Sequence, residues 1–277
     1  MPKKNVGLIG CGTIGTHLAL AIEAGRIANA SLIGLFDIVY ENAKSLKSKL
    51  KSSSEVHADF GSLIDSPVDI IIEAASQEAV RKFAKPTIEA SKDLMIMSVG
   101  ALTDTTFFAE LLDQAAIRKG LSKIYVPTGA IAGIDAIRSV KHLLDSITLT
   151  TTKSPKALAG APFFSTREIN LDAITKVTEI YEGSASEAVK LFPANVNVAA
   201  VLSLAGIGAD KTKVRVLVDP HATTNQHEIV ATGRFGDIRI AVNNVTTPGN
   251  PKTSFLAVLS AIECLRSICD DTLRIGS

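Results

Sequence analysis

The sequence predicts an α/β protein in which an N-terminal doubly wound parallel sheet is followed by a second, α+β domain. Apolar strand-like runs alternate with helical segments over residues 1–125, and strands separated by helices of this length pair in parallel through right-handed crossovers. Residues 126–250 are rich in β-branched runs that do not alternate strictly with helices, a texture typical of an α+β domain. An amphipathic segment within 251–277 predicts a C-terminal helix that joins the first domain.

Each expected strand of the first domain is an apolar run, and each expected helix has apolar residues at three- and four-residue spacing. The expected strands are 5–10, 30–37, 68–76, 93–102 and 122–130, and the expected helices are 15–27, 40–50, 77–91 and 107–120. Pro86 predicts a break in the third helix, because proline removes a backbone donor.

The second domain is expected to contain strands, a hairpin and one long internal helix. The expected strands are 146–154, 212–220 and 227–245, the last with a turn at Gly236-Asp237. A helix is expected over 188–208, entered near Pro193, and the C-terminal helix over 252–271.

The charge balance, the aromatic content and the cysteines of the chain limit its expected partners and compartment. Lys and Arg number 29 against 28 Asp and Glu, aromatic residues are few and Trp is absent, so neither nucleic acid nor an anionic membrane is an expected partner. The three cysteines, Cys11, Cys264 and Cys269, form no C-x-x-C pair, which favours a reducing compartment. The apolar run near the N-terminus is too short for a signal-peptide core, so a soluble, cytoplasmic protein is expected.

Three glycines follow the first expected strand in G-x-G-x-x-G spacing, at Gly10, Gly12 and Gly15. By itself this spacing indicates only a tight strand-to-helix turn. In a dinucleotide site the first glycine permits the turn, the second lets the backbone approach the pyrophosphate, and the third lets helix and strand pack closely. Thr13 and Ile14 would then begin the helix whose N-terminal N–H groups face the phosphates.

Asp37 ends the second expected strand, 22 residues beyond Gly15. This is where an acid accepts hydrogen bonds from the adenosine ribose, so the two features together predict a dinucleotide site. A carboxylate there repels a 2′-phosphate, which favours NAD. NADP stays open, because Lys44 or Lys47 could reach over.

Small residues close two further strands of the predicted sheet, at Ala75 and Ser76 and at Gly100. Ligands of open α/β sheets bind beyond the carboxyl ends of the strands. We therefore expect these residues to lie against the cofactor, although small residues also serve simple turns.

Five histidines are candidates for the proton transfer that accompanies hydride transfer. Four of them, His17, His57, His142 and His221, lie in segments that read as surface helices or polar loops. His227 opens a strand of the second domain, where its ring could face a cleft, and is the preferred candidate.

Two amides follow Pro193. Asn195 is best explained as a helix cap, whereas Asn197 lies deeper and could bind the nicotinamide carboxamide. The sequence contains no metal-binding motif, cysteine cluster or hydrolase signature, so no metal is expected.

Several stretches together resemble the L-aspartate dehydrogenases of archaea and bacteria: GLIGCGTIG, VPTGAIAGIDAI, EGSASEAVKLFPANVNVAA, VDPHATTNQHEIVATGRFG and NPKTSFLAVLSAI. The resemblance covers nearly the whole chain. It implies an N-terminal Rossmann domain and a catalytic α+β domain that forms a homodimer. It further implies oxidation of L-aspartate with NAD or NADP to iminosuccinate, which hydrolyses to oxaloacetate and ammonia and in some organisms supplies NAD biosynthesis.

The resemblance also implies roles for individual residues. The family's catalytic histidine falls on His227, and its nicotinamide-contacting residues fall on Ala130 and Asn197. Relatives carry a basic residue in the GSAxEA stretch, where this chain has Ser186. The candidates that remain for binding a substrate carboxylate are Arg167, Arg234 and Lys252.

Other readings of the same residues stay open. A homoserine dehydrogenase-like or dihydrodipicolinate reductase-like oxidoreductase would use the same scaffold. A non-catalytic NAD-sensing module would bind NAD without turnover. A scaffold protein without a cofactor would require the glycines and Asp37 to match by chance.

Overall fold

The computed structural model describes residues 3–118, 120–165, 167, 169–193, 197–247, 250–270 and 272, with the backbone alone for residues 251 and 252. The chain divides into two compact units. Unit 1 comprises residues 1–127 and 258–277, and unit 2 comprises residues 128–257.

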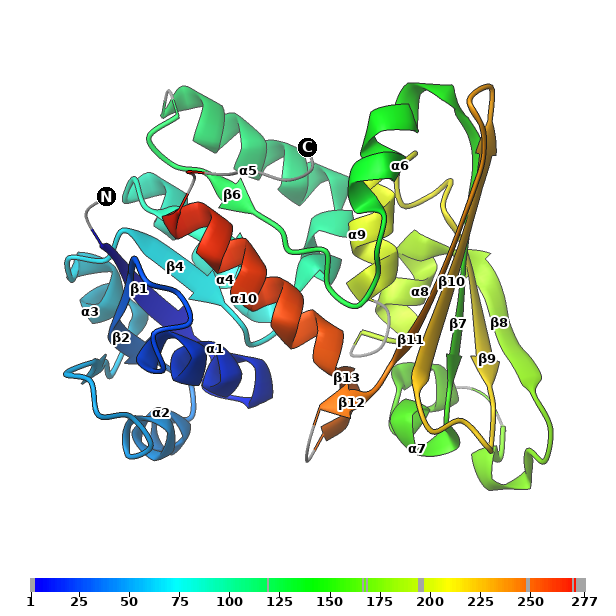
Figure 1. Cartoon of the computed structure of the whole chain (residues 1–277), viewed down its shortest axis with the longest axis horizontal. Coiled ribbons are helices and arrows are strands. Elements are labelled where there is room, and N and C mark those ends of the chain that lie inside the picture. The colour runs from blue at the N-terminus through cyan, green and yellow to red at the C-terminus, as the bar shows by residue number, and fades with distance from the viewer. Residues whose placement is uncertain are drawn as a thin grey trace. The chain divides into compact units, whose positions relative to one another are not determined.

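In the described part of unit 1, six strands form one parallel sheet in the order β3-β2-β1-β4-β5-β6 (Figure 1). The strands are β1 (Lys4–Ile9), β2 (Ala30–Phe36), β3 (Glu55–Val56), β4 (Ile70–Glu73), β5 (Asp93–Ile96) and β6 (Ile124–Tyr125). The order reverses between β1 and β4, as in doubly wound dinucleotide-binding sheets. The predicted α/β fold is therefore confirmed.

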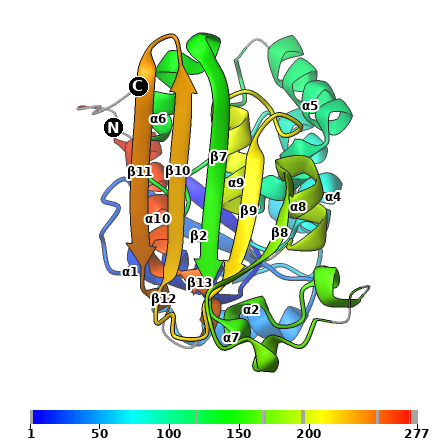
Figure 2. The same cartoon turned by 90° about the vertical axis from the view of Figure 1, so that its right-hand side faces the viewer.

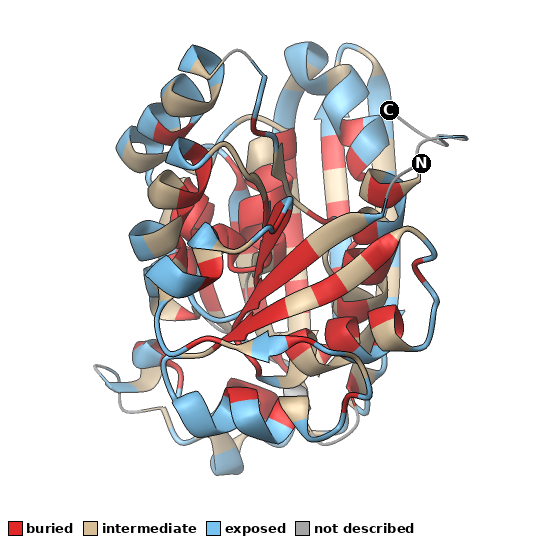
Figure 3. Ribbon diagram, turned by 90° about the vertical axis from the view of Figure 1, so that its left-hand side faces the viewer, coloured by how far each residue is buried: buried red, intermediate tan, exposed pale blue. Residues whose placement is uncertain are grey.

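The core of unit 1 lies along this sheet, because its central strands are apolar on both faces. β4 is buried at all four residues, and Figure 3 shows the strands of this sheet as largely buried segments between helices with exposed outer faces. The helices are α1 (Thr13–Glu23), α2 (Tyr40–Lys47), α3 (Phe60–Asp65), α4 (Gln77–Glu89), the 3₁₀ turn η1 (Val99–Thr103) and α5 (Thr105–Ile117). Continuous apolar strands of this kind are typical of parallel sheets covered on both faces.

The predicted break at Pro86 is wrong, because α4 continues through it to Glu89. Proline removes only one backbone N–H from the helical ladder. In the same turn, the Thr87 hydroxyl donates to the Phe83 carbonyl oxygen at 2.7 Å.

Unit 2 contains a mixed sheet of five strands among its described residues, in the order β11-β10-β7-β9-β8. The strands are β7 (Leu144–Lys153), β8 (Thr178–Ser184), β9 (Lys213–Val218), β10 (Asn225–Gly233) and β11 (Gly236–Asn244). β7 and β9 are parallel and the other neighbours are antiparallel. The short strands β12 (Thr246–Thr247) and β13 (Asn250–Ser254) form a separate pair.

One face of this sheet is covered by helices and the other is not covered by the described residues (Figure 2). The covered face carries buried side chains at alternate positions of β7, β9 and β10, as strand geometry requires. The helices of the unit are α6 (Ile134–Val140), the 3₁₀ turn η2 (Lys141–Leu143), α7 (Pro155–Leu158), the 3₁₀ turns η3 (Pro162–Ser165) and η4 (Leu171–Ala173), α8 (Ala185–Leu191) and α9 (Asn197–Ala205). α10 (Phe255–Cys269) begins in unit 2 and continues in the residues of unit 1.

Two predictions for unit 2 need correction. The hairpin turn consists of Arg234 and Phe235, because Gly233 pairs with Gly236, which is already the first residue of β11. The single helix expected over 188–208 is two helices, α8 and α9. α8 starts before the predicted region, where the Ser184 hydroxyl accepts from the Glu187 N–H at 3.3 Å, and it ends at Leu191, shortly before Pro193.

Candidate active site

The turn after β1 is built around Gly10. Its φ of +92° lies in the left-handed region, and a Cβ there would approach the carbonyl carbon of Ala74 to 2.7 Å. The Gly10 N–H donates to the Phe36 carbonyl oxygen at 2.8 Å, which ties the turn to the end of β2. Both backbone conformation and packing therefore require glycine at this position.

Gly12 and Gly15 differ sharply in their surroundings. A Cβ on Gly15 would collide with the Gly10 carbonyl oxygen, so Gly15 lets α1 pack closely on the turn. A Cβ on Gly12 would meet no protein atom within 4 Å. Gly12 is also the N-cap of α1, with no side chain capping the helix, and Thr13 and Ile14 are its first helical residues. The N-terminus of α1 thus faces open space of the kind that a pyrophosphate occupies.

Asp37 follows β2 and is half-buried. Its Oδ2 accepts from the Cys11 N–H at 2.8 Å, and its Oδ1 accepts from the Val39 N–H at 2.9 Å and from Asn42 Nδ2 at 3.3 Å. An ionised carboxylate has about four acceptor sites, so one remains for a ligand hydroxyl. The same bonds fix the carboxylate in place beside the glycine turn.

Lysines that could accommodate a 2′-phosphate are engaged elsewhere. Lys44 forms an ion pair with Glu41 at 3.0 Å, and Lys47 donates to the Ser52 carbonyl oxygen. Lys82 is a further lysine near the end of β2, since it lines the same pocket as Phe36 and Ile38.

Glu73 is a site residue that sequence reasoning missed. It ends β4 with 1% of its surface exposed. Its Oε1 accepts from the Ala75 N–H at 2.8 Å and from Ser98 Oγ at 2.9 Å, and its Oε2 accepts from the Ser98 N–H at 2.9 Å. Burial raises the pKa of this carboxyl group. Glu73 thereby holds the ends of β4 and β5 together. In the sequence, an acidic residue at the end of an otherwise apolar strand could have indicated its importance.

The small residues expected near the cofactor follow these two strand ends. Ala75 and Ser76 are exposed, and the Ser76 hydroxyl caps α4 by accepting from the Ala79 N–H at 3.2 Å. Gly100 is buried within η1. Their contact with a cofactor stays a prediction.

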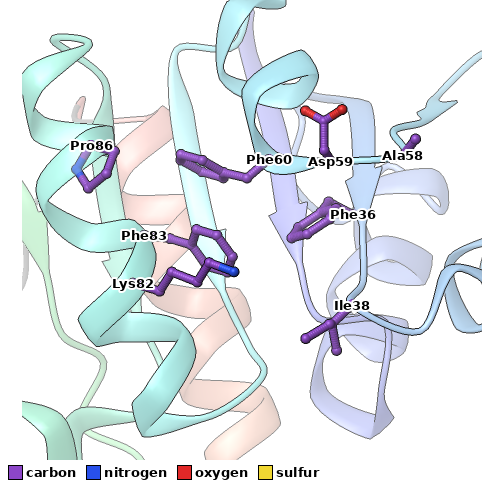
Figure 4. Close-up of a pocket in the computed structure, with 8 residues that line it drawn as sticks. All are labelled: Phe36, Ile38, Ala58, Asp59, Phe60, Lys82, Phe83 and Pro86. Carbon is purple, nitrogen blue, oxygen red and sulfur yellow. The ribbon is translucent and has the colours of Figure 1, made fainter.

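An apolar pocket of about 470 Å³ opens at Ile38, directly after Asp37 (Figure 4). Phenylalanine side chains from three elements and the ring of Pro86 line much of it, as Figure 4 shows. The lining residues are Phe36, Ile38, Ala58, Asp59, Phe60, Lys82, Phe83 and Pro86. Planar aromatic groups fit such walls.

In unit 2 the structure places His227 on the covered face of the sheet, with 3% of its surface exposed. It lies opposite Thr151 of β7 in the register of the two strands, and His227 Nδ1 and Thr151 Oγ1 are hydrogen-bonded. The bond orients the imidazole ring.

Lys153 lies on the same buried face, two residues beyond Thr151, and is also 3% exposed. Burial lowers the pKa of Lys153 to about 8. Burial and, secondarily, the charge of Lys153 lower the pKa of His227 to about 3. His227 is therefore neutral at physiological pH, as a general base must be before it accepts a proton.

Ala130 is fixed at the same end of this sheet. Its carbonyl oxygen accepts from Asn244 Nδ2 at 2.9 Å, and both residues are buried. Asn244 pairs in register with Asn225, two residues before His227, and Asn225 Nδ2 donates to Ser254 Oγ at 3.2 Å. The structure thus ties the Ala130 backbone to β11, beside the end of β10 that carries His227.

The other predicted candidates are more scattered. Asn197 is the half-buried first residue of α9, and its role stays a prediction. Asn195 and the side chain of Lys252 lie outside what the structure describes. Arg167 and Arg234 are exposed, and the Arg167 guanidinium lies over the Phe163 ring at 4.2 Å.

The remaining histidines and the wider fold add further observations. His57, which was expected in a polar connection, is buried, and its Nδ1 lies 3.3 Å from Ser62 Oγ. Among the described residues, no three His, Cys, Asp or Glu side chains gather as a metal ion would require. The same residues include no helix with both the length and the apolar character of a bilayer span.

Comparison with known proteins shows which families and relatives this chain is similar to. Two family models match it: "Homoserine dehydrogenase, NAD binding domain" over residues 10–127 and "Aspartate dehydrogenase, C-terminal" over residues 135–268. The L-aspartate dehydrogenases of Nitrosopumilus maritimus and Methanosarcina barkeri are 48% and 47% identical to it. These alignments cover 99% and 95% of this chain and 100% and 96% of the relatives.

A crystal structure of aspartate dehydrogenase from Thermotoga maritima superposes with a TM-score of 0.77, at 25% identity and with complete coverage of both chains. The first family model supports a nicotinamide cofactor for this fold. By sequence identity over nearly its full length, the chain belongs to the L-aspartate dehydrogenase family.

Proposed function

We propose that the protein catalyses the oxidative deamination of L-aspartate. Two electrons and a proton pass as hydride from Cα to the nicotinamide, the amine loses a proton, and iminosuccinate forms. Water then adds to the imine and releases oxaloacetate and ammonia. The observation that carries the proposal is the buried, neutral His227, held by Thr151 in a domain that matches the aspartate dehydrogenase family.

His227 is the proposed acid/base. If its Nδ1–H donates to Thr151 Oγ1, Nε2 is free to accept a proton from the substrate amine or from the attacking water. Such help contributes roughly 10²–10⁴-fold to a rate.

The cofactor is proposed to be NAD. The open space at Gly12 fits a pyrophosphate, and Asp37 is positioned for the ribose hydroxyls. The adenine would lie at the Ile38 end of the apolar pocket. Because Asp37 is fixed by three hydrogen bonds, it cannot turn away from a 2′-phosphate, so we expect NADP to bind more weakly. Ala130 and Asn197 are proposed to contact the nicotinamide, as the family resemblance implies.

The reaction is proposed to take place in the cytoplasm and to supply iminosuccinate for NAD biosynthesis. The free thiols Cys11, Cys264 and Cys269 support a reducing compartment. The biosynthetic role and the direction of the reaction rest on the family resemblance alone.

A homodimer is proposed to form through the uncovered face of the unit 2 sheet. The half-exposed positions Thr148, Thr150 and Val230 share this face. Glu228 and Arg215, which lie beside Thr150 in register, add charged groups that a second copy would pair. Light scattering during size exclusion should give twice the 29.2 kDa mass of the chain; a monomer at micromolar concentration contradicts this part of the proposal.

The experiment that tests the activity is a substrate panel followed at 340 nm. L-aspartate with NAD should give the highest kcat/KM, above L-glutamate, L-alanine and L-homoserine. Homoserine is included because the NAD-binding family model comes from homoserine dehydrogenase. A preference for homoserine, or NAD binding without turnover of any amino acid, would overturn the assignment.

A further inference from the structure

The covered face of β7 changes character at its end. Its buried positions are Ile147 and Leu149, followed by Thr151 and then Lys153, the last residue of the strand. The first two are ordinary core residues. The last two place a hydroxyl and an ammonium group where a core side chain would otherwise lie.

The buried side of β7 ends in a charged side chain. Lysine is almost never fully buried unless it is paired, because withdrawing an ammonium group from water is unfavourable. Lys153 is nevertheless among the most buried polar residues of unit 2, and desolvation is the cause of its lowered pKa.

The position of this ammonium relative to the proposed acid/base is the second observation. Lys153 and His227 share one face of the adjacent strands β7 and β10. His227 lies opposite Thr151, two residues before Lys153, and the charge of Lys153 acts on the imidazole. A cation and a neutral base thus lie close together on one buried face of the sheet. L-aspartate and iminosuccinate each carry two carboxylates close to Cα, the carbon at which the proposed reaction takes place.

We propose that the Lys153 ammonium binds a carboxylate of the dicarboxylic substrate beside His227. The inference rests on the proposed function and assigns the carboxylate contact that the exposed Arg167 and Arg234 were expected to make. Charge-assisted hydrogen bonds to carboxylates are the stronger class of polar contact.

Carboxylate binding at Lys153 also has a consequence for His227. The free enzyme disfavours the imidazolium through burial and through the charge of Lys153. The negative charge of a bound carboxylate offsets that positive charge, so it raises the pKa of His227 and makes the imidazole a better proton acceptor.

The test uses Lys153→Met, which keeps length and volume but removes the charge, with the exposed Lys156→Met as the matched control. Succinate binding is measured by calorimetry on the NAD-saturated protein, and the KM for L-aspartate and the Kd for NAD are measured separately. We expect Lys153→Met to weaken succinate binding and raise the KM for aspartate by about 10- to 150-fold, the loss of one charged hydrogen bond. The Kd for NAD and the behaviour of Lys156→Met should not change.

The outcomes separate this inference from the proposed function. If the protein does not oxidise aspartate but loses succinate binding in Lys153→Met, the carboxylate site stands and the assigned reaction fails. If wild-type protein does not bind succinate, or Lys153→Met changes succinate Kd and aspartate KM by less than twofold, the inference is overturned. Should Lys153→Met not fold, Lys153→Gln carries the same comparison.

Discussion

Replacing Gly12 with alanine adds one methyl group at the N-terminus of α1, where no protein atom lies within 4 Å. The φ of −75° and ψ of −158° at this residue suit alanine. Losing glycine at an N-cap costs about 0.5–1 kcal/mol, and the stiffer unfolded chain offsets about 0.4–1 kcal/mol. The free energy of unfolding should therefore change by less than about 1 kcal/mol.

Cofactor binding should respond far more strongly. The methyl group would occupy the space that we assign to the pyrophosphate, and overpacking of this kind costs about 1–3 kcal/mol. The Kd for NADH should rise by about 5- to 150-fold, since 1.4 kcal/mol corresponds to a factor of ten. Titration of NADH fluorescence measures this Kd, and thermal unfolding measures the stability.

Gly15→Ala is the matched contrast, because its methyl group would collide with the Gly10 carbonyl oxygen. This variant should lose stability by about 1–3 kcal/mol as well as cofactor affinity. If Gly12→Ala binds NADH as tightly as the wild type, the pyrophosphate does not lie at the glycine turn and the cofactor assignment is refuted.

Three further predictions concern the charges and the imidazole of the site. His227→Ala should lower kcat by roughly 10²–10⁴-fold with an unchanged Kd for NAD, while the exposed His221→Ala should leave kcat intact; near-normal turnover in His227→Ala would disprove the acid/base role. Asp37→Ser should reduce the preference for NAD over NADP by at least about tenfold in kcat/KM, because it removes a fixed carboxylate, and an unchanged preference would count against the ribose contact. Since the pKa of His227 is about 3 in the folded protein and about 6.5 when unfolded, the unfolded state binds the extra proton between these values and stability falls as pH drops from 6.5 toward 3. At pH 5 the loss relative to pH 8 is about 2 kcal/mol, measurable by urea unfolding. His227→Gln should lack this part of the pH dependence, and identical profiles would show that His227 is not buried as a neutral ring.

Local sequence patterns were sufficient to predict the position of the glycine turn, the parallel sheet of unit 1 and the position of Asp37 after the second strand. The turn depends on residues that are close together in the sequence. A short apolar run that ends at glycine or at an acidic residue is enough to predict where a buried strand lies. β3 was missed because two residues are too short for a periodic signal. The hairpin turn was misplaced because Gly236 is a strand residue with a φ of +116° rather than a central turn residue.

The candidate site in unit 2 could not be predicted from local patterns, because it is formed by the pairing of strands that are distant in the sequence. Alternation along β7 could have indicated that Thr151 and Lys153 share a face with Ile147 and Leu149. It could not have indicated that Thr151 lies opposite His227, 76 residues away, because register is set by the assembled sheet. The contact of Asn244 with the Ala130 carbonyl spans 114 residues and carries no local signal.

The reaction itself is tested most directly by the stoichiometry of products from L-aspartate and NAD. Absorbance at 340 nm gives NADH, and coupled assays give ammonia and oxaloacetate from the same sample. We predict that the three products form in equal amounts and that His227→Ala suppresses all of them together. Absence of NADH with both NAD and NADP, or NADH formed without ammonia, would contradict the assignment of an aspartate-oxidising dehydrogenase.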